Sequence, residues 1–375
     1  MTGTDASAAV PAAPGRRPGA GFWTVAFAFL IVMAVATLPS PLYGLYRARD
    51  HLSALTITVV FAIFAGSTIA VLLLDSAIAA RIGRRGTMLG AVAMMMVAAG
   101  VLAAWPDLPG LLLGRLLTGV SVGLAAGTAI TYLIELRLRA GPAASPARAR
   151  TIGTSVTVGA LGIGPLIAGC LAQWVAEPLT VPYLVFIALG AIALIGLRAA
   201  PETGAPASEG KPATGARAAE EKPEPAAPGP PAAEEKPVRE GEPAASRRAA
   251  RLPVPAAAGT LAAFSANGLF AGLSGLFLAT TLHHPSHALS GAALFLLFAC
   301  GVAAQLATLP AARVLALGTA SMLAGLALLV VSVRLAPPSL ALFLTGGALI
   351  GAGSGAVFTG TTGIVLAASP PAASR

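Results

Sequence analysis

Apolar stretches long enough to cross a membrane dominate the hydropathy pattern of this chain. A span needs roughly 20 mostly apolar residues to cross about 30 Å of hydrocarbon. On that criterion we predict ten helical spans, at residues 21–41, 55–74, 87–105, 110–134, 152–175, 180–199, 254–281, 288–309, 314–333 and 339–367. The pattern therefore indicates an all-α, polytopic membrane protein.

Two segments have no apolar pattern. Residues 1–20 are small, polar and proline-rich, which predicts a disordered cytoplasmic tail. The alternative is a cleaved signal peptide, but the following apolar run is longer than a usual signal core. Residues 201–252 repeat Pro, Ala, Glu and Lys, which predicts a flexible cytoplasmic linker. We expect this linker to join a six-helix bundle at 21–200 to a four-helix partial bundle at 253–375.

Composition and charge placement support the membrane interpretation. The chain is 56% hydrophobic and 10% charged, whereas soluble domains carry about a quarter charged residues. With the N-terminus in the cytoplasm, four of the 24 Lys and Arg residues fall outside the inner side: Arg47, Arg49, Arg115 and Arg334. This asymmetry predicts a multi-pass protein of a bacterial-type inner (plasma) membrane with both termini cytoplasmic. The net charge of +9 is then a topology signal and not a sign of nucleic-acid binding.

The connection between the second and third spans carries the pattern Arg-x-Gly-Arg-Arg. Its members are Arg81, Gly83, Arg84 and Arg85. A short glycine turn lets two helices reverse tightly, and the flanking arginines can pair with acids or with helix C-termini of the other half. The alternative is an ordinary basic cytoplasmic loop.

The fourth span contains a charge. Arg115 inside an apolar helix costs at least about 2.5–3.5 kcal/mol at the bilayer centre, so it should face a watery cavity or a partner. Gly119, four residues on, lies on the same helix face and permits close packing. The alternative is that Arg115 extends its side chain to the outer headgroups.

The fifth span is rich in glycine and contains one proline. Gly164-Pro165 at mid-helix removes a backbone hydrogen bond and should kink the span. Gly159, Gly164 and Gly169 together predict a smooth face for another helix. The alternative is the general tolerance of membrane helices for Gly and Pro.

Polar side chains in other spans are candidates for lining a cavity, namely Gln173, Asn267 and Gln305. Helix–helix hydrogen bonds are the alternative role for each of them. We expect the three outer-loop histidines to be solvated, and Cys170 and Cys300 to pack as small apolar residues. No nucleotide-binding loop and no catalytic set is evident, so we expect no enzyme, no cofactor and no metal site.

Taken together, the three motifs resemble the major facilitator superfamily (MFS). Ser76 and Ala80 stand where the family's loop signature has Gly and Asp, and Asp75 lies one turn earlier. The family's span-four Arg is linked to proton coupling in drug antiporters, and the span-five pattern resembles the antiporter signature. The resemblance implies twelve helices in two halves that alternately expose a central site. This chain supplies ten, as though truncated after the tenth.

The expected function is proton-coupled efflux of a drug-like or small amphipathic molecule out of the cell, through a protein that is embedded in membrane lipid. The candidate coupling residues are Arg115, Asp75 and Glu135. Arg115 and Glu135 are 20 residues apart on one helix, about 30 Å at 1.5 Å per residue, so we do not expect them to pair. The alternatives are an importer of a small nutrient and a truncated, non-transporting membrane protein.

Overall fold

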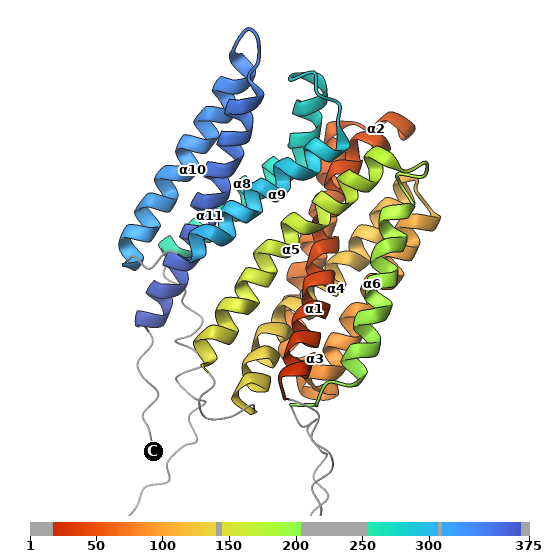
Figure 1. The fold of residues 1–375 in the computed structure, drawn as a ribbon, viewed down its shortest axis with the longest axis vertical. Helices are drawn as coiled ribbons and strands as arrows, with labels where there is room; N and C mark the ends of the chain where they lie inside the picture. The colour runs from red at the N-terminus through yellow and green to blue at the C-terminus, as the bar shows by residue number, and fades with distance from the viewer. Residues whose placement is uncertain (1–17, 140–144, 204–253, 307–309, 369–375) are drawn as a thin grey trace, which may run out of the picture.

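The computed structural model describes residues 18–139, 145–203, 254–306 and 310–368, and its regular structure in these ranges is helical (Figure 1). The elements are α1 (Pro18–Thr37), η1 (Ser40–Leu42), α2 (Tyr43–Asp50), α3 (Ala54–Ala104), α4 (Leu108–Arg139), α5 (Pro146–Trp174), α6 (Val181–Arg198), α8 (Val254–Thr280), α9 (His287–Gln305), α10 (Ala311–Arg334) and α11 (Leu340–Ala368).

Ten helical segments among the described residues are long and apolar enough to cross a membrane. The chain is therefore an all-helical polytopic membrane protein, as the hydropathy pattern predicted. The second and third spans both lie within α3. Helix α1 begins at Pro18, so the last three residues of the predicted tail are helical. The rest of that tail and residues 204–252 of the predicted linker lie outside the described residues.

The chain reverses direction inside α3 at Gly83. This residue has φ 75° and ψ 167°, which are not helical angles. Glycine has no Cβ and adopts positive φ at little cost. Arg49 precedes α3 and donates a hydrogen bond at 3.0 Å to Asp107, which follows it. The two ends of α3 therefore meet at the same end of the bundle, and Gly83 lies at the other.

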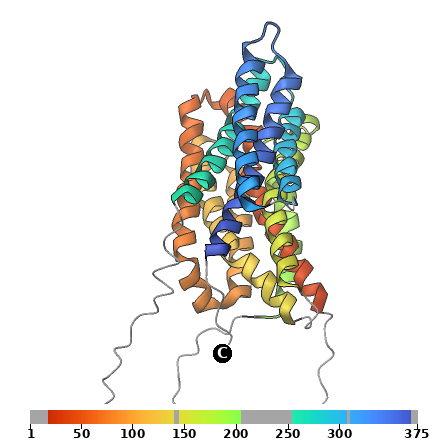
Figure 2. The same ribbon diagram turned by 90° about the vertical axis from the view of Figure 1, so that its left-hand side faces the viewer.

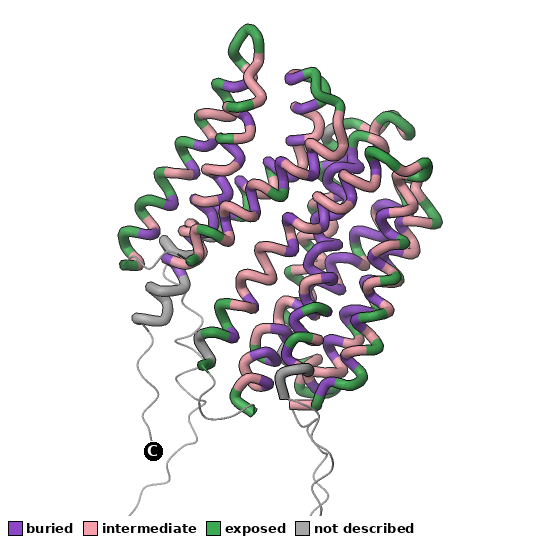
Figure 3. Tube along the Cα trace, in the orientation of Figure 1, coloured by how far each residue is buried: buried purple, intermediate pink, exposed green. Residues whose placement is uncertain are grey.

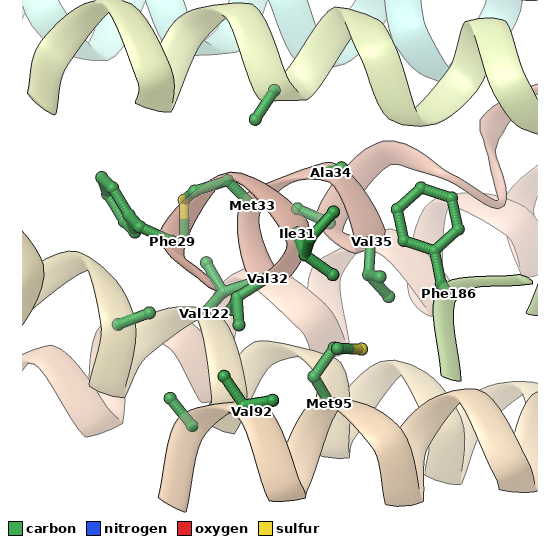
Figure 4. Close-up of a cluster of buried hydrophobic side chains, with 14 of the residues drawn as sticks. Phe29, Ile31, Val32, Met33, Ala34, Val35, Val92, Met95, Val122 and Phe186 are labelled. Carbon is green, nitrogen blue, oxygen red and sulfur yellow. The ribbon is translucent and has the colours of Figure 1, made fainter. Parts of the chain in front are cut away.

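The core of the N-terminal half surrounds α1. Val25, Phe29, Val32 and Val35 on this helix are completely buried. A helix that is apolar on all sides packs at the centre of a bundle. Figure 4 shows α1 residues packed among side chains of neighbouring helices. These are Val92 and Met95 of α3, Val122 of α4 and Phe186 of α6.

Helix α4 packs on the first span of α3 through three glycines four residues apart. A Cβ atom added to Gly119, Gly123 or Gly127 would collide with Ser67, Val71 or Asp75, respectively. Residues at this spacing lie on one helix face, and without side chains they let two backbones approach. This contact fixes the position of Asp75 against α4.

The C-terminal half has a smaller core and more exposed apolar surface. Phe270 of α8, Leu294 and Leu297 of α9 and Ile350 of α11 are buried together. Helix α10 packs on α11 and presents an exposed stripe on its other side (Figure 3). The first span of α3 lies at the edge of the bundle (Figure 2) and is also exposed. Of its most apolar 18-residue stretch 11% is buried, whereas the corresponding share for the first span of the chain is 72%.

The two halves meet along α5 and α9, which run side by side in Figure 1. We call the end of the bundle with the 281–287 loop the histidine end. The opposite end, with the Gly83 turn, is the arginine end. Helix α5 continues past the C-terminus of α9 toward the arginine end (Figure 1). This geometry positions the contacts described next.

Candidate functional site

The halves are in backbone contact at the histidine end. A Cβ atom on Gly169 of α5 would collide with the His287 carbonyl of α9. Similarly, one on Gly291 of α9 would collide with the Pro165 carbonyl of α5. The Gln173 side-chain oxygen accepts hydrogen bonds from the His287 N–H at 3.0 Å and the Ser286 hydroxyl at 3.1 Å. Small residues and one polar clamp thus close this end of the interface.

A groove of about 400 Å³ lies closer to the arginine end, where α5 extends beyond α9. Its lining is almost entirely apolar and comes from α1, α5 and the residue after α9. The lining residues are Leu30, Thr151, Ile152, Ser155, Val156, Gly159, Ala160, Ile163 and Leu306. The hydroxyl groups of Thr151 and Ser155 add polar atoms to one wall. A groove of this chemistry suits an amphipathic molecule.

The glycines of α5 separate two packing faces. Gly164 lies against the Ala34 carbonyl of α1, whereas Gly159 and Gly169 face α9. Pro165 lies between them, with its carbonyl against Gly291. Helix α5 is therefore held to its own half and to the other half through residues with little or no side chain.

The Gly83 turn at the arginine end is held by the segment that follows α6. The Glu202 Oε1 atom accepts hydrogen bonds from the backbone N–H groups of Arg84 at 3.0 Å and Arg85 at 3.3 Å. A carboxylate at the start of a helix satisfies donors that have no helical partner. Arg139 of α4 donates to the carbonyls of Glu202 and Thr203, at 2.7 and 2.9 Å. The residues just after α6 thus connect α3, α4 and α6.

The same turn carries an ion pair. The Arg84 Nε atom lies 2.8 Å from the Glu135 carboxylate of α4, and both side chains are partly buried. The Arg85 guanidinium donates to the Ala200 carbonyl at 3.3 Å. Arg81 is exposed. Glu135 therefore pairs with the loop motif and not with Arg115, as the spacing along α4 predicted. These partners of Arg84 and Arg85 belong to the N-terminal half, whereas the loop arginines were expected to pair with the other half.

Asp75 is buried between α3 and α4. One of its oxygens accepts a hydrogen bond from the Thr128 hydroxyl at 2.9 Å, and its side chain lies against Gly127. Its exposed fraction is 7%. A buried carboxylate within a span is costly, and such groups commonly mark ion or proton pathways.

Arg115 is buried toward the histidine end, with an exposed fraction of 1%. Its Nη1 atom donates to the Ala36 carbonyl of α1 at 2.8 Å. Its guanidinium carbon lies 4.1 Å from the centre of the Phe64 ring and 5.9 Å from that of Phe61. Aromatic faces attract a cation, and Ala36 lies in the last turn of α1, where backbone carbonyls concentrate negative charge. Arg115 therefore does not extend its side chain to the headgroups.

A buried group of tyrosines in the N-terminal half was not anticipated from the sequence. The hydroxyls of Tyr46 and Tyr183 are 3.1 Å apart and buried. Tyr43, three residues before Tyr46, is buried as well. Tyr46 and Tyr183 are separated by 137 positions in the sequence, so no local pattern would have paired them. The pairing of Tyr46 with Tyr183 is visible only in three dimensions.

The predicted cavity-lining residues lie elsewhere. Gln173 belongs to the clamp at the histidine end, and Asn267 of α8 shares hydrogen bonds with Ser354 of α11 at 3.1 and 3.2 Å. The Gln305 Nε2 atom is buried without a hydrogen-bond partner. None of the three lines the groove. Among the described residues, no group of His, Cys, Asp or Glu could hold a metal ion.

Comparisons with known proteins address the fold. No match was found among curated proteins. A bacterial homolog of the human lysosomal transporter Spinster, solved in inward-facing states, matches at TM-scores of 0.63 (unoccupied) and 0.61 (occupied). The unoccupied structure is 15% identical in sequence, and the match covers 96% of this chain and 77% of that one. The occupied structure is 14% identical, and the match covers 96% of this chain and 76% of that one. The human organic anion transporter MFSD10 (TETRAN) matches with a TM-score of 0.51 and 20% identity, over 94% of both chains.

A family model described as Major Facilitator Superfamily matches residues 25–375, which is most of the sequence. The ten spans and the structural matches agree with it. This chain therefore belongs to the major facilitator superfamily of membrane transporters.

Proposed function

We propose that this transporter exports a drug-like or small amphipathic molecule by alternating access, driven by protons. One observation carries the proposal: the halves are closed at the histidine end, while an apolar groove lies beside α5 on the other side. With the basic loops inside, this arrangement is an inward-facing state that takes its substrate from the cytoplasmic side.

Three charged residues have different roles in coupling proton movement to export. Asp75 is a buried carboxylate that can gain and lose a proton next to Thr128. Glu135 stabilises the Gly83 turn through Arg84. Arg115 is buried toward the histidine end, away from Glu135. Its role is to hold α1 to α4 by charge, through the Ala36 carbonyl. Coupling then depends on how the protonation of Asp75 alters the α3–α4 contact.

The transport test uses the purified full chain in liposomes, with a fluorescent amphipathic dye as the probe. A pH gradient should drive the dye against its own gradient and in the direction opposite to the protons. A protonophore should abolish the movement, and vesicles without protein are the control. Movement of the dye with the protons would indicate the importer, and no movement under either gradient would contradict transport of this class of molecule.

The orientation has its own test. Ala80 at the arginine end and His284 at the histidine end are both exposed. In a background without Cys170 and Cys300, a membrane-impermeant maleimide added to intact cells should label a His284→Cys variant. An Ala80→Cys variant should react only after permeabilisation. The reverse result would invert the orientation and the direction assigned to the groove.

A further inference from the structure

The groove beside α5 has a closed end and an open end. At the closed end, Thr37 of α1 donates a hydrogen bond at 2.7 Å to the Leu161 carbonyl of α5. Gly164 lies directly against the backbone of α1, and Gly162 lies directly against that of α9. The three helices therefore meet around Ile163, which lines the groove at this end. On the other side of these contacts, α5 extends beyond α9 and the groove opens toward the arginine end (Figure 1).

The polar side chains of the lining are confined to the open end. Thr151 and Ser155 are four residues apart, so their hydroxyl groups lie on one face of α5, one turn from each other. The lining toward Ile163 is apolar. From Thr151 to Ile163 the helix rises about 18 Å, at 1.5 Å per residue. The groove is thus long and narrow, with hydrogen-bonding groups at one end only.

None of the described residues that line this groove is charged. A charged group of a bound molecule would lose water near Ile163 without gaining a counter-charge, which is strongly unfavourable. The volume of about 400 Å³ is at the lower end of the range for small-molecule sites. The chemistry of the lining therefore favours a small molecule without charge on its buried part.

Gly159 lies midway along the groove. A Cβ atom on this residue would be 3.8 Å from the Val302 side chain of α9, which is an ordinary contact distance. Alanine therefore fits here, whereas the remaining atoms of a larger side chain would extend across the groove toward α9. The missing side chain of Gly159 leaves the space between α5 and α9 open at this level.

We propose that the groove binds an uncharged, linear amphiphile, with its apolar end at Ile163 and its hydrogen-bonding group at Thr151 and Ser155. Gly159 determines how wide a molecule fits. The inference rests on the export function proposed above, because it names the class of molecule exported and its orientation. Burial of the apolar part supplies most of the affinity, and the two hydroxyl groups fix the direction.

Arg148 is the rival partner for the polar end. It precedes Ile152 by one turn on the same face of α5 and is exposed. An anionic head group beyond the mouth of the groove could pair with it. However, Arg148 does not line the groove, whereas the hydroxyl-bearing residues do. An Arg148→Gln variant separates the two explanations, because it removes the charge and leaves Thr151 and Ser155 in place.

The test is photoaffinity labelling of the purified full chain in detergent. The probe is a medium-chain primary alcohol with a diazirine on its last carbon, and labelled residues are mapped by mass spectrometry. This probe should label the protein at or beside Ile163, and an isomer with the diazirine next to the hydroxyl should label it at or beside Ser155. The unlabelled alcohol should compete saturably. The reversed labelling pattern, or no saturable labelling of the groove, would overturn the proposal.

Competitors of equal length test the charge. The carboxylate and the trimethylammonium analogues should compete at least about tenfold more weakly than the alcohol, because their charge has no partner in the groove. Arg148→Gln should leave the affinity for the alcohol unchanged. Competition by the carboxylate that equals that of the alcohol and is lost in Arg148→Gln would assign the head group to Arg148 and overturn the uncharged class.

Substitutions in the groove test its polar end and its width. Ser155→Ala should bind the alcohol about fivefold more weakly, the size of one hydrogen bond. Gly159→Ala should bind it more weakly than the unaltered protein, and Gly159→Leu should lose labelling. Gly272→Leu is the matched control, since nothing lies within 4 Å of a Cβ atom on Gly272. If Gly159→Leu does not fold, the other two groove variants decide, and unchanged affinity in both would overturn the proposal.

The labelling assay does not depend on transport, so the two proposals can fail separately. Labelling of the groove without dye movement in liposomes would contradict the proposed export and leave the binding site intact. Dye movement driven by the pH gradient without labelling of the groove would support export and overturn the site.

Discussion

The Glu202 carboxylate lies 3.0 Å from the position that a Cβ atom on Gly83 would occupy, although the two residues are far apart in the sequence. The backbone of Gly83 has a positive φ, and the helical segment that follows it begins with N–H groups that donate hydrogen bonds to the Glu202 carboxylate. The loop motif and the segment after α6 are therefore one structural unit. Its parts can be tested separately.

Gly83→Ala should destabilise the protein. With φ 75° and ψ 167°, Gly83 lies in a region open essentially to glycine alone, where another residue costs about 1–3 kcal/mol, and the added Cβ would also press on Glu202. The measurement is thermal unfolding of the purified protein in detergent. Gly90→Ala is the control, since nothing lies within 4 Å of its added Cβ and Ala favours a helix interior by roughly 0.5–1 kcal/mol. Equal Tm shifts in the two variants would refute this account of the turn.

Glu202→Gln should lower stability by about 1 kcal/mol, in the range of a lost helix cap. The amide keeps one acceptor oxygen but removes the negative charge at the start of the helix. Thermal unfolding again provides the measurement, and Glu177→Gln, at an exposed residue of the histidine end, is the control. If the Glu202 variant unfolds at the temperature of this control, the carboxylate has no stabilising role.

The sequence predicted the spans well because a membrane span is a local property of about 20 residues. It did not predict what the polar residues inside them contact. Arg115 was expected to face a watery cavity or an unspecified partner, or else to reach the headgroups. Its actual partners are the Ala36 carbonyl, 79 residues away, and the ring of Phe64. Neither a carbonyl nor a phenyl ring leaves a charge pattern that marks it as a partner.

The same limit applies to the other polar residues. Gln173 and Asn267 were candidate cavity residues, with a helix–helix hydrogen bond as the alternative. The alternative holds, because Gln173 binds the start of α9 and Asn267 binds Ser354. Hydropathy shows that a side chain is polar but not toward which helix it points. Glu202 was read as the beginning of a linker because it follows the last apolar residues. Its contact with Arg84, 118 residues away, depends on how α3 and α6 pack.

Arg115→Ala should abolish pH-gradient-driven dye movement while leaving membrane insertion intact. The substitution removes a charge that joins α4 to the last turn of α1, and it leaves the apolar length of the span unchanged. Dye movement in liposomes and the amount of protein in the membrane are the two measurements. Arg137→Gln provides the control for loss of one positive charge on the same helix. Normal dye movement in Arg115→Ala would remove this residue from the mechanism.

Gly169→Val should hold the histidine end open. The added side chain would occupy the space of the His287 carbonyl, so α5 and α9 could not close over η1. Ser40 of η1 is 6% exposed in the closed arrangement and serves as the reporter. In a background without Cys170 and Cys300, a Ser40→Cys thiol should react faster with a membrane-impermeant reagent when Gly169→Val is present. Gly272→Val is the matched control, because nothing lies within 4 Å of a Cβ atom on Gly272. An equal labelling rate in both variants would mean that the Gly169 contact does not close this end, and the inward-facing assignment would lose its support.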